Sequence, residues 1–412
     1  ILERLARLPQ WQQMLAADTA TRFPETTLPG DGTHIWGTSS ADGSKHTALQ
    51  SSPTSKATGD AGITRWTWLI AGGVSALAIA LLGLGLWGRT RLPRSQPALV
   101  IDNADSAELE QNVPTTQVEL LQTFSAHQNS INALLVLSDQ RRFVSASADN
   151  TLRLWDLSTG ETLQTYEGHT TFVNTIILSP DEKTLYSGSA DGSIYQWALA
   201  TGERQAEWLG HDGPVNILAR TPDGQRLVSG GSDGTLKVWN VQNQSLGNTI
   251  TGHEGGINTL VVTSDGRRVI SGGTDLFVRV WDIASATELQ SFVAHESFIN
   301  QIAVSPDGRI LFSASADETI KRWDLNGGDL LDTLTQHVSY VNVLYFSRDG
   351  RTVSSGSADE MVHVWDVKTG DLIQTYTGFD MPLDHLLVLS DGRILTASKQ
   401  NPAIKSWLVN EK

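Results

Sequence analysis

The stretch from His295 to Asp324, HESFINQIAVSPDGRILFSASADETIKRWD, is one copy of a unit that this chain repeats. Its tryptophan belongs to a series that recurs every 42 residues, without an insertion or a deletion between members. The members of the series are Trp155, Trp197, Trp239, Trp281, Trp323, Trp365 and Trp407. A spacing this regular indicates that one structural unit occurs seven times in succession.

Three further residue types keep the same period. The histidines, 28 residues before each tryptophan, are His127, His169, His211, His253, His295 and His337, with Phe379 in the last position. The aspartates, six residues before, are Asp149, Asp191, Asp233, Asp275, Asp317 and Asp359, with Asn401 last. The serines, ten residues before, are Ser145, Ser187, Ser229, Ser271, Ser313 and Ser355, with Ala397 last. The last unit thus lacks all three partners of its tryptophan.

Within one unit the apolar residues alternate with a period of two, which predicts short β-strands. The first unit gives strands over 131–137, 143–147 and 151–155, followed by an outer strand over 161–166. Turn sequences such as Pro222-Asp223-Gly224 and Asp191-Gly192 separate the strands in other units. A period of about 40 to 45 residues with four strands is typical of a propeller blade. The sequence therefore predicts an all-β, seven-bladed propeller over residues 117–412.

The last unit ends after its third strand, so one strand must come from elsewhere. Val118–Phe124 has the pattern Leu-Gln-Thr-aromatic that also ends the outer strands Leu163–Tyr166 and Ile373–Tyr376. We expect Val118–Phe124 to complete the seventh blade and close the ring. Closure would remove the two free sheet edges of an open array.

The pairs Gly168-His169 and Trp323-Asp324, repeated in register, resemble those of the WD-repeat (WD40) β-propeller family from about Val118 to the C-terminus. Trp197-Ala198, Trp239-Asn240 and Trp407-Leu408 depart from the second pair. The resemblance implies a protein-binding platform. It also implies that the His, Ser, Asp and Trp series form a structural network in which aspartate orients the imidazole and serine joins it to the indole N–H.

The resemblance further places a partner-binding surface on the top face, around the central channel. Five residues after the histidines stand Asn132, Asn174, Asn216, Asn258, Asn300, Asn342 and Asp384. The aromatic residues three positions after a histidine are Phe172, Phe298 and Tyr340. The alternatives are that each asparagine bonds to its neighbouring blade and that the aromatic rings pack against adjacent loops.

The composition of the chain argues against several classes of binding site and catalytic site. Residues 117–412 carry 35 acidic and 21 basic side chains, so an acidic propeller is not expected to bind nucleic acid directly. Absence of cysteine excludes disulfides and thiolate metal sites. The histidines are dispersed around the ring, and the Asp-Gly pairs lack the further ligands of a calcium loop. We predict no catalytic residue, no metal site and no cofactor.

The first 65 residues contain no recognisable domain. Residues 1–16 place leucines at helical spacing, which fits a short helix or the tail of an upstream domain. Residues 17–65 are rich in Ser, Thr and Gly, and are expected to be a flexible linker. Because the chain begins at Ile1, either a processed protein or a fragment of a longer one fits the sequence.

Residues 66–87 are free of charge, and at about 1.5 Å per residue a helix of this length spans a bilayer core of about 30 Å. Trp66 and Trp87 stand where an aromatic belt would lie. A buried hairpin or a signal peptide is the alternative, but a signal peptide would lie nearer the N-terminus. We predict a single transmembrane helix, with residues 88–116 as a juxtamembrane linker.

Arg89, Arg91 and Arg94 follow this span, whereas Lys56 and Arg65 precede it, a slight bias toward a cytoplasmic propeller. The side of the membrane stays open. The combined prediction is a membrane-anchored protein–protein interaction scaffold without enzymatic activity. The alternative is the sensory or docking portion of a larger membrane protein, such as a receptor-like kinase with an upstream catalytic domain.

Overall fold

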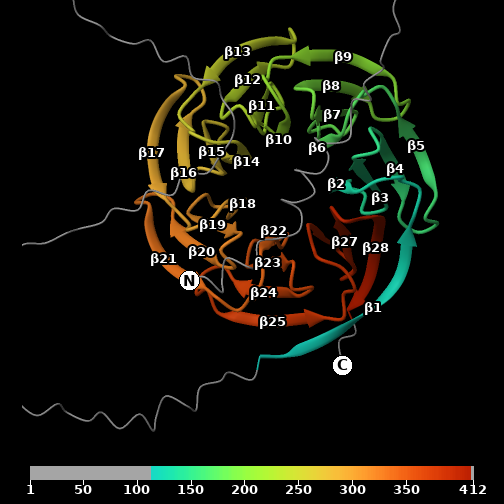
Figure 1. Cartoon of the computed structure of the whole chain (residues 1–412), viewed down its shortest axis with the longest axis vertical. Helices are drawn as coiled ribbons and strands as arrows, with labels where there is room; N and C mark the ends of the chain where they lie inside the picture. The colour runs from blue at the N-terminus through green and yellow to red at the C-terminus, as the bar shows by residue number, and fades with distance from the viewer. Residues whose placement is uncertain (1–112, 410–412) are drawn as a thin grey trace, which may run out of the picture. The chain divides into compact units, whose positions relative to one another are not determined.

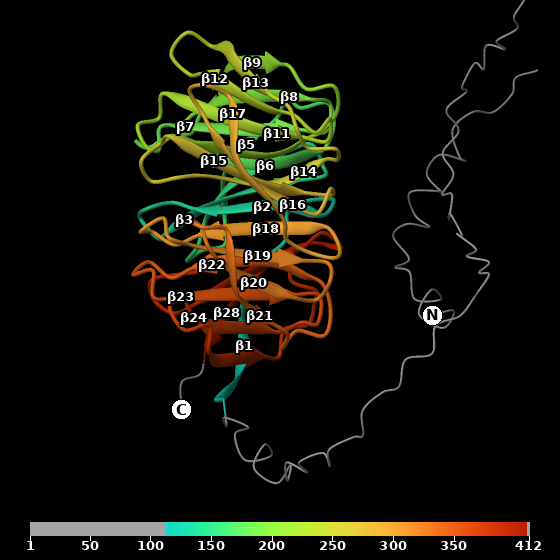
Figure 2. The same ribbon diagram turned by 90° about the vertical axis from the view of Figure 1, so that its left-hand side faces the viewer.

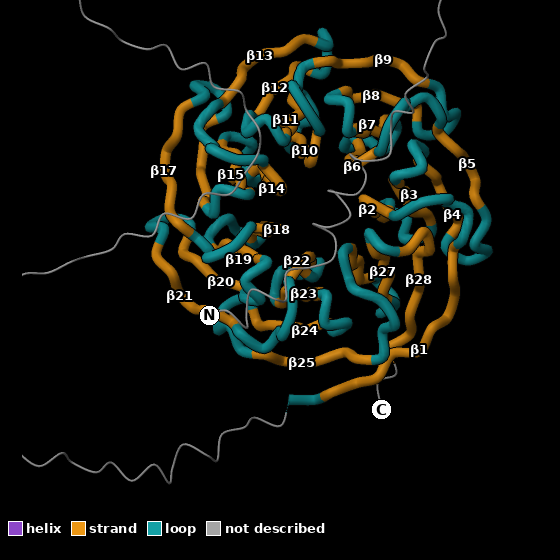
Figure 3. The backbone as a smooth tube through the Cα atoms, in the orientation of Figure 1, coloured by secondary structure: helices purple, strands orange, loops and turns teal. Residues whose placement is uncertain are grey.

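The computed structural model describes residues 113–409, and the regular elements in that range are the strands β1 to β28. They form seven four-stranded blades around a central axis (Figure 1). In each blade the first strand lies innermost and the last outermost, and loops join consecutive strands at both ends (Figure 3). Figure 2 shows the same strands from the side.

The strands of blades 1 to 4 have the following bounds. Blade 1 contains β2 (Ile131–Val136), β3 (Arg142–Ser147), β4 (Leu152–Asp156) and β5 (Thr162–Tyr166). Blade 2 contains β6 (Val173–Leu178), β7 (Thr184–Ser189), β8 (Ser193–Ala198) and β9 (Arg204–Leu209). Blade 3 contains β10 (Val215–Arg220), β11 (Arg226–Gly231), β12 (Leu236–Asn240) and β13 (Ser245–Ile250). Blade 4 contains β14 (Ile257–Val262), β15 (Arg268–Gly273), β16 (Phe277–Asp282) and β17 (Thr287–Val293).

Blades 5 to 7 complete the ring. Blade 5 contains β18 (Ile299–Val304), β19 (Ile310–Ser315), β20 (Ile320–Asp324) and β21 (Asp329–Leu334). Blade 6 contains β22 (Val341–Phe346), β23 (Thr352–Ser357), β24 (Val362–Asp366) and β25 (Leu372–Thr377). Blade 7 contains β26 (His385–Val388), β27 (Ile394–Ser398), β28 (Asn401–Val409) and, from the other end of the repeats, β1 (Thr115–Phe124). The strands expected from alternation in the first unit are found within about one residue.

The predicted role of Val118–Phe124 as the fourth strand of the last blade is confirmed. β1 pairs antiparallel with β28, with Val118 opposite Val409 and Phe124 opposite Ile404. Its first residues, 115–117, also pair in parallel with residues 375–377 of β25, so β1 joins blades 6 and 7 into one eight-stranded sheet. The innermost strand β26 contacts both β22 and β2, which closes the ring.

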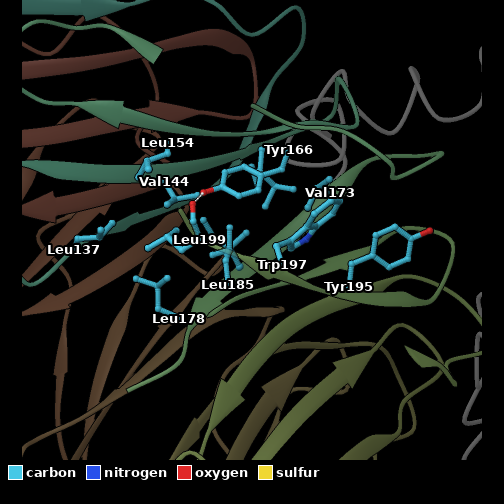
Figure 4. Packing of buried hydrophobic residues seen from close by; sticks show 13 residues of the cluster. Leu137, Val144, Leu154, Tyr166, Val173, Leu178, Leu185, Tyr195, Trp197 and Leu199 are labelled. Carbon is cyan, nitrogen blue, oxygen red and sulfur yellow. Dashed lines mark hydrogen bonds between the residues drawn. The ribbon is translucent and has the colours of Figure 1, made fainter. Parts of the chain in front are cut away.

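The apolar core lies between neighbouring blades. One buried cluster combines Val144 and Leu154 of blade 1 with Leu178 and Trp197 of blade 2 (Figure 4). The cluster at the closure combines residues of β1 and blade 1 with residues of blade 7, among them Phe124 and Leu395. Because each blade buries its face only against its neighbour, the fold depends on the complete ring.

The four predicted parts before the propeller lie outside the described residues, except the end of the 88–116 linker. This includes the transmembrane helix predicted at 66–87. Between residues 113 and 409 the structure contains no helix of the length and apolarity that a membrane crossing requires.

Candidate partner-binding face

The histidine loop, the second strand and the third strand of blade 1 bring four distant side chains together. Ser145 on β3 is completely buried, and its hydroxyl lies 2.7 Å from His127 Nε2. Trp155 Nε1 donates to the same hydroxyl over 2.8 Å. His127 Nδ1 lies 2.8 Å from a carboxylate oxygen of Asp149 in the turn after β3. These bonds satisfy polar groups whose burial would otherwise cost about 1–3 kcal/mol each.

Blades 3 to 6 show the same four-residue arrangement. The histidine–aspartate distances are 3.0 Å for His211–Asp233, 2.9 Å for His253–Asp275, 2.8 Å for His295–Asp317 and 2.7 Å for His337–Asp359. In each of these blades the serine hydroxyl contacts the histidine Nε2 and accepts the indole N–H.

Electrostatics agree with a structural role for this network. Burial acts to raise the pKa of Asp149, but hydrogen bonds from His127 and Thr151 hold it well below its usual value. Burial lowers the pKa of His211 and His253, against the effect of their aspartates. In blades 3 and 4 burial therefore favours the neutral imidazole, whose Nδ1–H can donate to the aspartate carboxylate.

Blade 2 departs from the predicted network. His169 and Trp197 bond to Ser187, but Asp191 forms no hydrogen bond with His169. Thr170 donates its hydroxyl to Asp191 over 3.0 Å instead, and the Tyr195 ring stacks on the imidazole with centroids 4.0 Å apart. His169 Nδ1 is left without a partner among the described residues, and burial lowers the pKa of this histidine to about 4.

Blade 7 contains a register shift that the constant spacing conceals. Ile394 pairs with Trp407, whereas the 42-residue period would place Leu395 there, as Leu311 pairs with Trp323 in blade 5. The turn before β27 is therefore one residue shorter, and the loop after it is one residue longer. Thr396, rather than Ala397, occupies the serine position, and its hydroxyl accepts the Trp407 indole N–H over 2.7 Å.

The sequence contained a signal for this shift. When the last unit is shifted by one residue against blade 5, Ile-Leu-Thr-Ala-Ser at 394–398 aligns with Leu-Phe-Ser-Ala-Ser at 311–315. Thr396 then aligns with Ser313, so both units have a hydroxyl at the serine position. The assignment of Ala397 to the serine position was therefore wrong. Phe379 does take the place of a histidine beside the tryptophan, with its ring edge-on to Trp407 and centroids 5.1 Å apart.

The asparagine series forms a belt around the inner strands. Each asparagine donates its amide N–H to a backbone carbonyl of the next blade, over 3.0 to 3.3 Å. The donor–acceptor pairs are Asn132–Val173, Asn174–Val215, Asn216–Ile257, Asn258–Ile299, Asn300–Val341 and Asn342–Leu383. The alternative in which each asparagine bonds to its neighbouring blade is thus the arrangement present.

Asp384 ends this belt in blade 7. Its carboxylate accepts bonds from Asn342 Nδ2, the backbone N–H of Lys399 and the Ser398 hydroxyl. The whole belt lines a central cavity of about 750 Å³, together with Phe172 and two residues that the sequence did not single out, His385 and Lys399. Because the amide nitrogens are engaged by backbone carbonyls, the asparagines contribute mainly acceptor oxygens to this cavity.

The three aromatic residues singled out by sequence differ in exposure. Phe172 is 50% exposed and Phe298 is 41% exposed, each in the loop leading into an innermost strand. Tyr340 is partly buried. Val338 was missed, although it is 74% exposed and follows a histidine at a position where the other units have polar residues.

Residues 113–409 contain no cluster of three or more His, Asp or Glu side chains that could hold a metal ion. The predicted network residues are spread over the blades, and the belt residues meet at the central cavity. Phe172 lines this cavity as well, whereas Phe298 and Tyr340 do not.

Six consecutive segments match the family model described as WD domain, G-beta repeat. The matched residues are 118–156, 160–198, 202–240, 244–282, 286–324 and 328–366, together more than half of the chain. Each match begins with the outermost strand of one blade and ends with the third strand of the next, so each repeat joins two blades. No curated protein matches the chain. With its strands arranged as a propeller and its repeats matched in series, the chain belongs to the WD domain, G-beta repeat family.

Proposed function

We propose that this protein is a membrane-anchored scaffold whose seven-bladed propeller binds a protein or peptide partner on the face that carries the asparagine belt, without catalytic activity of its own. The observation that carries the proposal is the exposure of Phe172 and Phe298 at equivalent positions of two blades, in the loops that lead into the innermost strands, with Phe172 also lining the central cavity. Exposed aromatic rings are frequent interface hot spots, because they bury a large apolar area at little cost in side-chain entropy.

The cavity suggests the chemistry of the partner. Its asparagines offer carbonyl oxygens, and the propeller carries an excess of acidic side chains. A complementary partner segment would bring hydrogen-bond donors and positive charge. Lys399 lies at the same cavity, so the site is not uniformly acidic.

Membrane attachment rests on the uncharged segment 66–87. In this proposal residues 88–116 connect the span to the propeller, and the arginines after the span favour the cytoplasmic side. Carbonate extraction of membranes containing the full chain tests attachment, because an anchored chain stays in the pellet. Protease digestion of sealed vesicles then tests the side, because a cytoplasmic propeller is protected only inside right-side-out vesicles.

The partner-binding proposal is tested by proximity labelling with the full chain and with a Phe172→Ala/Phe298→Ala/Tyr340→Ala variant. Proteins labelled by the wild type and lost from the variant are the expected partners. The matched control is Leu209→Ala, which removes a 71% exposed leucine from the outer strand β9. Equal loss of the same proteins in the control, or no loss in the triple variant, would reject this face as the binding surface.

A further inference from the structure

The second strand of each blade contains a position whose side chain packs against the next blade. In blades 1 to 5 it holds a large residue that is at least 96% buried: Val144, Tyr186, Val228, Ile270 and Phe312. Blade 6 has Ser354 instead, which is 8% exposed. Because serine is much smaller than the residues at this position in blades 1 to 5, the boundary between blades 6 and 7 lacks most of an apolar side chain.

Blade 1 shows how this boundary is filled elsewhere. Val144 packs there among Leu154 and Tyr166 of its own blade and the leucines of blade 2 (Figure 4). The Tyr166 hydroxyl also donates to the Leu199 carbonyl of blade 2 over 2.6 Å. The boundary between blades 1 and 2 is therefore closed by both packing and a hydrogen bond.

Between blades 6 and 7 there is instead a cavity of about 490 Å³, within the usual size of small-molecule pockets, about 300–1,000 Å³. Ser354, Tyr345, Val364 and Tyr376 line it from blade 6, and Val388 and Ile394 line it from blade 7. It also borders Asp391 and Gly392 in the turn between β26 and β27, the turn that is one residue shorter than its counterparts. That turn lies at the opposite end of the inner strand from Asp384, so this cavity opens away from the asparagine belt.

The cavity is lined by aliphatic side chains and by the polar residues Ser347, Thr352, Ser354 and Asp391, together with two tyrosines. The Ser354 hydroxyl has no hydrogen-bond partner within residues 113–409, although the residue is more than nine-tenths buried. The bordering carboxylate of Asp391 forms an ion pair with Arg393 at 2.8 Å. This hydroxyl is accessible from the cavity, so it can bond to a bound molecule.

We propose that this cavity is a binding site for a small uncharged ligand with an aromatic or branched aliphatic body and one hydroxyl or carbonyl group that bonds to Ser354. The aliphatic side chains would enclose the body. A charged ligand would have to lose its hydration, and the carboxylate at the cavity, Asp391, is already paired with Arg393. The site is separate from the proposed partner-binding face, so the two proposals can fail independently.

The chain has no cysteine, so a single introduced thiol reports on this cavity alone. The full-length Ser354→Cys variant is equilibrated with bis(2-phenylethyl) disulfide or with bis(2-aminoethyl) disulfide, at graded concentrations of 2-mercaptoethanol. The thiolate attacks the probe disulfide, forms a mixed disulfide and releases one thiol. Intact-protein mass spectrometry measures the reductant concentration that halves labelling. We expect this concentration to be at least about tenfold higher for the neutral aromatic probe than for the charged probe.

Two control variants bound the result. Ser158→Cys places the thiol in an exposed turn and should be labelled equally well by the two probes. Val228→Cys places the thiol at the equivalent, filled position of blade 3 and should be labelled by neither probe. A Ser354→Cys variant that behaves like either control would overturn the proposal. If Ser354→Cys does not fold, Thr352→Cys at the edge of the same cavity takes its place.

The hydrogen bond to Ser354 has its own test. With Thr352→Cys, the 4-hydroxyphenyl analogue of the aromatic probe should be retained at least about threefold better than the phenyl probe. This preference should vanish when Ser354→Ala is added. A preference that is absent from the start, or unchanged by Ser354→Ala, would contradict the polar contact.

Discussion

Trp407 donates its indole N–H to Thr396 over 2.7 Å, and not to the position that the 42-residue period assigns to a serine. Blade 7 thereby keeps its tryptophan bonded although it lacks the histidine, serine and aspartate of the other blades. Its tryptophan is as deeply buried as the others, at 2% exposure. The indole N–H is therefore satisfied in all seven blades, whereas the histidine–aspartate bond is missing from blades 2 and 7.

Thr396→Val removes the acceptor while keeping the shape of the side chain. We expect the free energy of unfolding to fall by about 1–3 kcal/mol, because the buried indole N–H loses its partner. Adding Ala397→Ser to Thr396→Val places a serine at the position that the period assigns. This second substitution should not restore the lost stability. Urea denaturation followed by tryptophan fluorescence measures both. A full rescue would mean that β27 follows the period after all.

Val118→Asp tests whether β1 holds the ring closed. Val118 is buried against Phe379 and Trp407 of blade 7, so an unpaired carboxylate there should destabilise the propeller by about 3 kcal/mol or more. Leu121→Asp lies in the same strand but is 48% exposed, and should change stability by no more than about 0.5 kcal/mol. Similar losses in both variants, measured by urea denaturation, would argue against this arrangement of β1.

Trp239→Ala removes a large side chain from the boundary between blades 2 and 3. Trp239 stacks on Trp208 with ring centroids 5.8 Å apart and donates to Ser229 over 2.9 Å. We expect a loss of about 3–5 kcal/mol in the free energy of unfolding, because a cavity forms where packing is dense. A loss below about 1 kcal/mol in chemical denaturation would contradict its assignment to the core.

Phe298→Ala distinguishes a binding residue from a core residue. Since its ring is 41% exposed, the variant should change the free energy of unfolding by less than about 1 kcal/mol. Partner capture in the labelling experiment should nevertheless weaken. Differential scanning calorimetry on the same preparation provides the stability measurement, and a large drop in Tm would place the ring in the core.

His169 predicts a dependence of stability on pH. Burial lowers its pKa in the folded protein to about 4 from an ordinary value of 6.5. As the pH falls, His169 is therefore protonated at a lower pH in the folded state than in the unfolded state. Its contribution to stability is complete above pH 6.5 and is lost as the pH falls toward 4, by up to about 1.4 kcal/mol per pH unit. His169→Gln should make the decline in unfolding free energy shallower across this window. Parallel curves for the two proteins between pH 6.5 and 4 would show that His169 does not titrate as described.

The sequence predicted the repeating unit, the strands of each blade and the strand that closes the ring. The repeating unit and its strands are local features, because alternation of apolar residues and turn chemistry act within a few neighbouring positions. The similarity of 118–124 to the other outer strands was enough to assign β1 to blade 7. The resemblance placed Phe172 and Phe298 on the surface, with packing against adjacent loops as the alternative, and both residues are exposed.

Only the tertiary structure decided which polar groups meet across blades. Asn174 gives its amide to Val215, 41 residues away in the next blade. Within blade 2, Thr170 replaces His169 as the partner of Asp191. The cavity beside Ser354 depends in the same way on how blade 6 packs against blade 7. The shifted register of β27 lies inside blade 7, in its pairing with β26 and β28. A periodic sequence determines each blade, but contacts between blades set hydrogen-bond partners and cavities, because these contacts join residues that are far apart in the sequence.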